Sequence, residues 1–215
     1  MRLMSSILDW LFPSRCAFCR RLIQDRAAIC PRCRDKLPYT GPAARQTFPH
    51  VDECCSPLYY VDEVRRSLLR YKFGGASMYA EIYGEILAEC IDESHISCDS
   101  ITWVPLSSQR LRKRGYDQAR LLAEATAKKL KIPCVPMLRK TRNNRAQSGT
   151  GNAEKRRQNV KNVYAALPDA PIRGKTVLLV DDIVTTGATL SACAEVLRKA
   201  GADSVFAATL ARRKD

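Results

Sequence analysis

Two pairs of cysteines near the N-terminus have the spacing of a metal site. Cys16 and Cys19 form one CxxC motif, Cys30 and Cys33 form another, and ten residues separate the two motifs. Four thiolates can surround one Zn2+ ion tetrahedrally, and two residues between paired ligands let each pair face the same ion. A reversible disulfide pair or buried free cysteines are the alternatives. We expect a closed, structural zinc site, because four protein ligands leave no position for a substrate.

A second stretch whose residue types could take part in chemistry is VLLVDDIVTTGATL, residues 177–190. An apolar strand ending in Asp181 and Asp182 places two carboxylates at the carboxyl end of a parallel sheet, where ligands bind. Carboxylates suit the vicinal hydroxyls of a ribose, or Mg2+ through water. Hydroxyls and closely spaced N–H groups at a helix N-terminus then suit a phosphate. These groups belong to Thr185, Thr186, Gly187, Ala188 and Thr189. The stretch predicts a ribose 5-phosphate site; an ordinary strand–turn–helix connection is the alternative.

The positive charge of the chain is concentrated in one segment. The chain has 215 residues and a net charge of +14, and from Ser107 to Lys161 there are 16 Lys or Arg residues against three acids. A block this basic indicates an anionic ligand, which could be a small-molecule phosphate, nucleic acid or an acidic membrane surface. A solvated surface is the alternative reading. Neither a P-loop nor a GxGxxG motif is present.

The apolar pattern predicts the elements that position these residues. The expected strands are 59–61, 101–105, 176–180 and 204–210, and the expected helices are 3–12, 62–73, 77–92, 116–130 and 188–200. Strand, helix and strand with short connections imply a right-handed, parallel βαβ unit, and hence an α/β fold. The polar and basic residues 139–160 are expected to form a long loop, of the kind that is often functional.

Composition divides the chain into three parts. We expect a helix and a small zinc-binding module with four cysteine ligands over residues 1–40, a linker over 41–56 and the α/β domain over 57–215. No signal peptide is visible, which predicts a cytoplasmic protein. The amphipathic segment 3–12 is too short to span a bilayer, and it would either pack on the domain or touch the inner face of the membrane. The other six cysteines lack metal-site spacing and are interpreted as small buried hydrophobic residues.

Several of these motifs resemble known families. VLLVDDIVTTGAT (177–189) resembles the phosphoribosyl pyrophosphate (PRPP) signature of type I phosphoribosyltransferases. VPLSSQRLRKRGYDQA (104–119), RKTRNNRAQSGTGNAEKRRQNV (139–160), YKFGG (71–75) and the CxxC pairs resemble ComF-type competence proteins, in the same order. The resemblance covers nearly the whole chain. It implies a type I phosphoribosyltransferase-like parallel sheet flanked by helices, behind an N-terminal zinc finger, and a part in DNA uptake during natural transformation.

The resemblance also implies roles for individual residues. Asp181 and Asp182 would hold the ribose hydroxyls of PRPP with Mg2+ and are the candidates for catalytic residues, while Val184 through Thr189 would enclose the 5-phosphate. The candidates for pyrophosphate and loop contacts are Lys72, Arg114, Gln118, Arg142, Gln147 and Arg156. The chain departs from the family pattern at Ser107, Asp117, Asn144 and Thr150. The Asp117 departure places a negative charge beside the expected pyrophosphate site.

Two functions fit these features. The first is PRPP and Mg2+ binding in support of DNA uptake, with single-stranded DNA contacting the basic segment or the finger, and with contacts to the membrane or the competence machinery. The second is an active glycosyltransferase that transfers phosphoribose from PRPP to a small nitrogenous acceptor, releasing pyrophosphate. A zinc-finger adaptor that binds neither ligand is a third reading. Only Tyr116 and Tyr164 flank the basic segment as candidates for base stacking.

Overall fold

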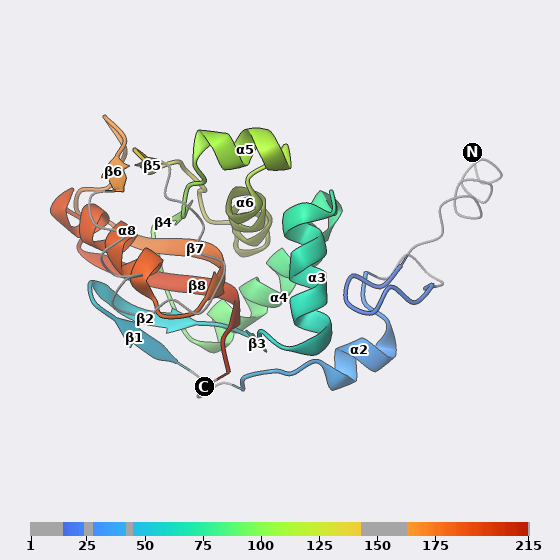
Figure 1. Cartoon of the computed structure of the whole chain (residues 1–215). Helices are drawn as coiled ribbons and strands as arrows, with labels where there is room; N and C mark the ends of the chain where they lie inside the picture. Colours follow the sequence, from blue (N-terminus) through green and yellow to red (C-terminus); the bar gives the residue numbers. More distant parts are fainter. Residues whose placement is uncertain (1–14, 24–27, 42–44, 143–162, 215) are drawn as a thin grey trace, which may run out of the picture.

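A computed structural model describes residues 15–23, 28–41, 45–142 and 163–214 of the chain. Six strands form the central sheet, in the order β1-β2-β8-β7-β4, with β3 also pairing with β8 (Figure 1). The strands are β1 (Gln46–Phe48), β2 (Val51–Cys55), β3 (Leu58–Tyr59), β4 (Ser100–Trp103), β7 (Thr176–Val184) and β8 (Ser204–Arg212). All pairs are parallel except β1 with β2. The expected parallel α/β sheet is confirmed.

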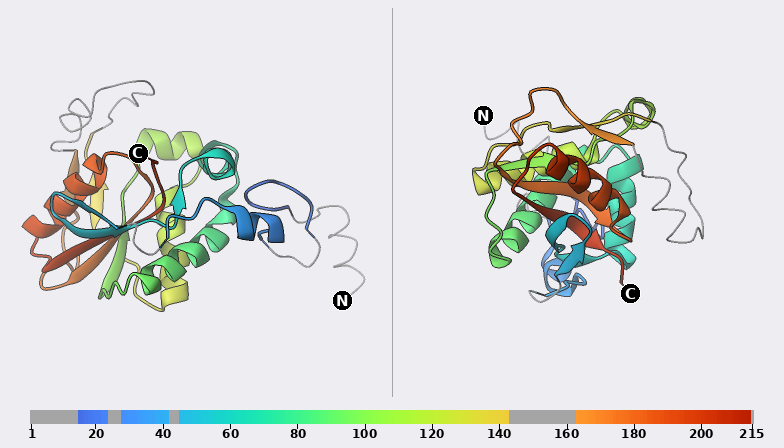
Figure 2. Two further views of the ribbon diagram at one scale, coloured as in Figure 1. Left: turned by 90° about the horizontal axis from the view of Figure 1, so that it is seen from below. Right: turned by 90° about the vertical axis from the view of Figure 1, so that its left-hand side faces the viewer.

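Helices cover both faces of this sheet (Figures 1 and 2). On one face lie α3 (Asp62–Phe73), α4 (Ala80–Glu93) and α6 (Gln118–Leu130), and on the other lies α8 (Ala188–Lys199). Along β7, Leu178 and Val180 pack into the first core, and Val177 and Leu179 into the second. Because both faces are covered, the strand is an unbroken apolar run instead of an alternating one.

A small antiparallel hairpin stands apart from the sheet. It consists of β5 (Leu138–Lys140) and β6 (Tyr164–Ala166), with Lys140 opposite Tyr164. The chain between these two strands is almost all of the expected loop 139–160, so that loop lies mostly outside the described residues. The expected helix 3–12 lies outside them as well. The hairpin contributes to the second core through Leu138 and Tyr164, which are buried with residues of α8.

Four expectations from the sequence differ from the structure. Residues 41–56 are not a linker throughout, because β1 and β2 lie in this range and β2 pairs with β8. The expected helix 116–130 corresponds to α6, and an additional helix, α5 (Ser108–Arg114), precedes it, with Gly115 at φ 81° between them. The third difference is that β7 continues to Val184, so the paired aspartates lie inside the strand. The helix expected over 77–92 begins as a 3-10 turn, η1 (Ser77–Tyr79), before α4.

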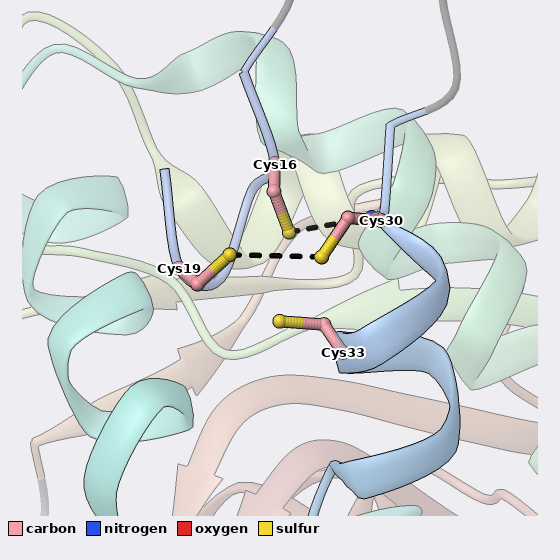
Figure 3. Close-up of side chains that lie close together, drawn as sticks. All are labelled: Cys16, Cys19, Cys30 and Cys33. Carbon is pink, nitrogen blue, oxygen red and sulfur yellow. Dashed lines mark hydrogen bonds between the residues drawn. The ribbon is translucent and has the colours of Figure 1, made fainter. Parts of the chain in front are cut away.

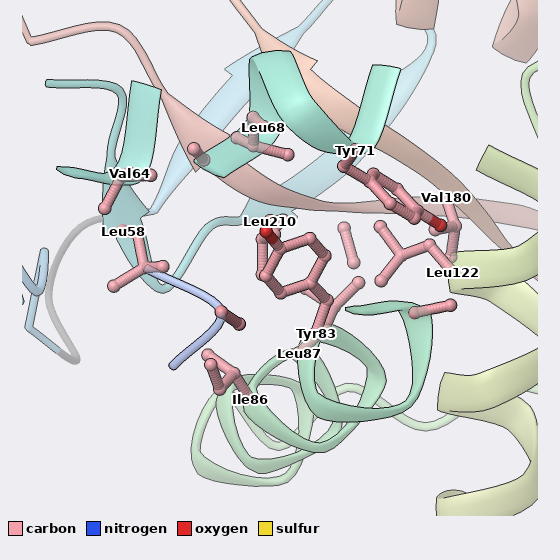
Figure 4. Close-up of a cluster of buried hydrophobic side chains, with 14 of the residues drawn as sticks. Leu58, Val64, Leu68, Tyr71, Tyr83, Ile86, Leu87, Leu122, Val180 and Leu210 are labelled. Carbon is pink, nitrogen blue, oxygen red and sulfur yellow. The ribbon is translucent and has the colours of Figure 1, made fainter. Parts of the chain in front are cut away.

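The zinc-like module packs into the same core as the helices. Its cysteines come from a turn after Arg15 and from the start of α2 (Pro31–Lys36), at the end of the molecule beside α3 and α4 (Figure 3). Ala17 and Phe18 are each 1% exposed and belong to the core cluster that includes Leu68 and Tyr83, part of which Figure 4 shows. No helix among the described residues is long and apolar enough to cross a membrane.

Candidate functional site

The paired aspartates lie inside β7, near its carboxyl end, on opposite faces of the strand. Successive side chains of a strand point to opposite faces. Asp182 therefore shares the face of Val180, toward α3 and α6, and Asp181 shares the face of Leu179, toward α8. The backbone N–H of Asp182 donates a hydrogen bond of 2.8 Å to Asp181 Oδ1. The two carboxylates thus have different surroundings, although they are neighbours in sequence.

Asp182 is buried and paired with a lysine from α3. Its Oδ1 lies 2.9 Å from Lys72 Nζ, and the two side chains are 5% and 19% exposed, respectively. Its Oδ2 is buried and has no hydrogen-bond partner among the described residues. An unpaired carboxylate oxygen in the interior is costly, so this atom is prepared to accept a hydrogen bond or to bind a cation.

Asp181 faces a less polar region. Burial raises its pKa, and the charge of Asp182 raises it further, while Lys72 acts in the opposite direction. On the same face, burial lowers the pKa of Lys140, whose Nζ lies 5.2 Å from the ring centre of Tyr164. A bound divalent cation would favour the ionised carboxylate of Asp181, as an opposite charge does for any acid.

Asp117, an acid near this site, has its carboxylate held by backbone N–H groups. It is the N-cap of α6, where Oδ1 accepts hydrogen bonds from the N–H groups of Ala119 (3.1 Å) and Arg120 (3.2 Å). Its Oδ2 accepts a third, from Leu106 N–H at 3.2 Å. Burial raises the pKa of Asp117, and these three donors oppose that shift. The carboxylate therefore serves the backbone that leads from β4 to α6.

Among the expected pyrophosphate contacts, Lys72 and Arg114 lie near Asp182, and Gln118 is buried at the start of α6. Lys72 is the ion-pair partner of Asp182. Gln118 is 4% exposed, its Oε1 lacks a partner among the described residues, and its backbone carbonyl accepts a 2.8 Å hydrogen bond from Tyr71 of α3. Arg114 ends α5, and desolvation lowers its pKa while the charge of Asp182 raises it. Arg142 is exposed beyond β5, and Gln147 and Arg156 lie outside the described residues.

The hydroxyl-rich turn leads from β7 into α8. Thr185 is exposed, Thr186 and Thr189 are half-buried, and Gly187 is the N-cap of α8 at φ 70°. A Cβ at Gly187 would overlap the ring of Phe48. Phe48, at the end of β1, thus fixes the backbone of the turn at the point where a phosphate would meet the helix N-terminus.

The four N-terminal cysteines form a compact cluster (Figure 3). Their sulfur atoms all lie within 4.8 Å of one another, and Cys19 Sγ lies 3.6 Å from Cys30 Sγ. A tetrahedral Zn2+ site with bonds of about 2.3 Å has sulfur–sulfur edges of about 3.8 Å, so the cluster fits a zinc ion. Within the described residues, no other group of three or more Cys, His or acidic side chains has this arrangement.

Two family models match different parts of the chain. One, described as a double zinc ribbon domain, matches residues 7–47, and the other, described as a phosphoribosyl transferase domain, matches residues 117–215. Competence protein F of Haemophilus influenzae is 27% identical over 225 residues, covering 94% of this chain and 98% of that protein. This relative spans both matched parts. The chain resembles the ComF family over nearly its whole length.

Other relatives agree with this resemblance. DNA utilization protein YhgH of Salmonella typhimurium is 28% identical to this chain over 204 residues, covering 88% of this chain and 86% of that protein. Competence protein ComFC of Streptococcus pneumoniae is 30% identical over 143 residues, covering 66% of this chain and 60% of that protein. The zinc ribbon match contains all four clustered cysteines, which together indicate a structural zinc site.

The roles of two positions of the chain are not evident from its sequence. Phe48 lies in the range interpreted as a linker, and nothing in its immediate sequence indicates that it packs on Gly187. Asp117 stands in the sequence as a charge beside the expected anion site. The N-cap preference of aspartate before a helical pattern is the signal that identifies its structural role.

We expect Gly187→Ala to destabilise the protein more than Gly174→Ala. Both glycines have positive φ, at 70° and 67°, so both substitutions strain the backbone. Only Gly187 has a ring in the way, while nothing lies within 4 Å of a Cβ at Gly174. The excess loss in the free energy of unfolding should be about 1–3 kcal/mol, measured by urea denaturation. Equal losses of stability in the two variants would show that the Phe48 ring can move aside without a free-energy cost.

Proposed function

We propose that this ComF-like chain binds PRPP together with Mg2+ at the end of β7 and takes part in the handling of DNA during its uptake. The observation that carries the first half is the presence of two buried oxygens, Asp182 Oδ2 and Gln118 Oε1, that lack partners among the described residues. Buried acceptors without partners are uncommon. A ligand that brings hydroxyl groups and a cation to this site would satisfy both.

The site offers a complement for each part of PRPP. The carboxylates of Asp181 and Asp182 suit the ribose hydroxyls, and the turn from Val184 to Thr189, at the N-terminus of α8, suits the 5-phosphate. Lys72 and Arg114 supply positive charge for the pyrophosphate. From the 139–160 segment, Arg142, Gln147 and Arg156 remain proposed contacts.

The same carboxylates fit a magnesium ion. Mg2+ prefers carboxylate and water oxygens, so Asp181 and Asp182 are the side chains that would hold it, directly or through water. Bound there, the ion would neutralise charge on the pyrophosphate group. Lys72 would then change partners, because Asp182 Oδ1 would be shared with the ligand.

Titration with PRPP and Mg2+ by calorimetry tests this site directly. Asp181→Asn combined with Asp182→Asn should weaken PRPP binding by about 10-fold or more, because each carboxylate loses charge-assisted hydrogen bonds. Asp92→Asn, at an exposed position of α4, is the matched control and should bind as the parent does. If the parent protein does not bind PRPP with Mg2+, the proposed site is wrong.

A second function, transfer of phosphoribose to a nitrogenous acceptor, is favoured by the cations beside Asp182. Lys72 and Arg114 would stabilise the departing pyrophosphate as its charge develops. His50 and His95 are both exposed, so neither histidine is placed as a base for the acceptor. Release of pyrophosphate from PRPP, measured over a panel of bases and amines, would demonstrate transfer. If no pyrophosphate is released at saturating PRPP, only the proposal of PRPP binding stands.

The DNA half of the proposal is supported by the relatives and by charge. The names of the relatives refer to competence and to DNA utilization. The segment from Ser107 to Lys161 has a large excess of basic residues. Neutralisation of phosphates by such residues drives binding to nucleic acid. The place we propose for this function is the cytoplasm, at the inner face of the membrane, where incoming DNA would meet the competence machinery.

A further inference from the structure

Exposed apolar side chains gather where α3 ends beside α5. Phe73, the last residue of α3, is 65% exposed, and Leu69, one turn earlier on the same helix, is 37% exposed. Leu111 of α5 is 43% exposed. A single exposed apolar side chain is ordinary, but several large ones close together on a surface are less common. Such apolar patches mark sites of interaction.

A guanidinium group holds Phe73 in place. The Arg114 Cζ lies 4.7 Å from the centre of the Phe73 ring, which joins the C-terminal end of α5 to the C-terminal end of α3 (Figure 1). Arginine over an aromatic ring is a favourable contact. Since this contact takes one side of the ring and the side chain is still 65% exposed, the rest of the ring remains open to a flat partner.

The helix that brings Arg114 is basic along its length. Its sequence, SQRLRKR, contains no acid, and Arg112 and Lys113 are exposed. Basic residues in a last helical turn also interact favourably with the helix dipole. The helix dipole can account for the basic residues, but it does not account for the exposed ring beside them. The two features together match the composition of surfaces that bind single-stranded nucleic acid, in which aromatic rings stack on bases and cations bind the phosphates.

We propose that Phe73, whose ring is held by Arg114, forms a binding surface for single-stranded DNA together with Arg112 and Lys113. A base stacks on the open face of Phe73, and the phosphates on either side are bound by the basic residues of α5. The proposal rests on the DNA half of the proposed function and names its surface. A duplex cannot use Phe73 in this way, because its bases are already stacked on one another.

The two tyrosines expected as stacking residues are not available for this role. Tyr164 is 7% exposed and has Lys140 beside its ring. Tyr116 is half-buried, its hydroxyl donates a hydrogen bond to the backbone carbonyl of Tyr71, and its ring packs against the Tyr71 ring at 6.1 Å. Among the described residues of α3 and α5, the open aromatic ring is Phe73.

Fluorescence anisotropy with a labelled oligothymidylate of about 16 nucleotides tests the surface. Phe73→Ala should weaken binding by about 10-fold, while Phe73→Trp, which keeps a ring, should bind at least as tightly as the parent. Phe73→Leu keeps apolar bulk without a ring and should behave like Phe73→Ala. Leu111→Ala is the control for loss of exposed apolar area and should change binding by less than about 2-fold. Because Phe73 is exposed, all of these variants should keep the parent thermal stability.

The electrostatic half has its own measurement. Arg112→Gln combined with Lys113→Gln should lower the slope of log affinity against log salt by about 1.4, since each phosphate contact contributes about 0.7. An unchanged slope, or parent-like binding by Phe73→Ala, would overturn the proposal. It would also be overturned if a duplex of the same length, or anionic lipid vesicles, bound in a manner equally sensitive to Phe73.

The result is separable from the PRPP test. Arg112→Gln combined with Lys113→Gln should leave the PRPP titration with Mg2+ unchanged, because both side chains are exposed and neither is a proposed PRPP contact. If PRPP does not bind the parent but DNA binding depends on Phe73, the PRPP site fails and the DNA surface remains. If PRPP binds and DNA does not, the surface alone is wrong.

Discussion

Removal of zinc from the cysteine cluster is expected to lower the melting temperature of the whole chain by about 10 °C or more. For a chain of this size, each kcal/mol of lost stability lowers the melting temperature by roughly 2–4 °C. The binding of structural zinc contributes more free energy than most domains have in reserve. The loss should extend beyond the N-terminal residues, because the module is part of the main core.

The contacts that transmit this loss are specific. Arg70 of α3 donates hydrogen bonds to the backbone carbonyls of Ala17 at 2.9 Å and of Phe18 at 2.7 Å, and Ser67 donates to Ala17 as well. The Phe18 ring lies 5.8 Å from the ring of Tyr83. Without the metal, the turn between the first two cysteines is no longer held in place. Ser67 and Arg70 of α3 then lose the backbone carbonyls that accept their hydrogen bonds. Tyr83, in the core shown in Figure 4, loses one of its covering rings.

Thermal unfolding with and without a chelator checks this expectation. Cys33→Ser should reproduce the effect of the chelator, and the chelator should cause no further decrease in that variant. Cys98→Ser, at a half-buried cysteine outside the cluster, is the matched control. If the chelated protein lost only the circular dichroism of the N-terminal residues, while the sheet and its helices melted at the parent temperature, the module would be independent of the core.

Lys72→Met is expected to decrease the free energy of unfolding by about 3 kcal/mol. The substitution keeps the length of the side chain but removes the ammonium group that lies 2.9 Å from Asp182 Oδ1. The Asp182 side chain is 5% exposed, and its Oδ2 already lacks a partner among the described residues. Removing one member of such a buried pair leaves the other charge uncompensated, which accounts for the size of the effect.

A double variant separates this cause from a general loss of packing. Lys72→Met combined with Asp182→Asn removes both charges and should recover at least half of the lost stability, as measured by urea denaturation. Lys113→Met, which removes an exposed lysine from α5, should have little effect. A double variant as unstable as the sum of the two single variants would show that Lys72 and Asp182 do not depend on each other.

The sequence is sufficient to predict the central part of the fold. The apolar run of β7 and the pattern of α8 are strong local signals, and both elements lie where they are expected. The strand β2 is missed because VDECC reads as polar, although Cys54 and Cys55 act as buried hydrophobic residues against β8. A cysteine that serves as a small apolar side chain is not distinguished by composition alone from one in a loop.

The candidate site is only partly predictable, for a different reason. Asp181, Asp182 and the turn after them are contiguous, so their relation to one another is visible in the sequence. The pairing of Lys72 with Asp182 and the packing of Phe48 on Gly187 join residues far apart in the chain. Such contacts depend on how α3 and β1 pack on the sheet, which local patterns do not specify.

The β5–β6 hairpin has a consequence for how the chain tolerates changes in length. Lys140 lies opposite Tyr164, so β5 and β6 hold the two ends of the intervening chain side by side. Closing a loop between fixed ends costs only about 0.6 kcal/mol more for each doubling of its length. Insertions or deletions between the two strands therefore change the loop entropy slightly and leave the register of the central sheet untouched. At this point of the fold, evolution or engineering can alter the length of a strongly basic segment without rebuilding the domain that carries it.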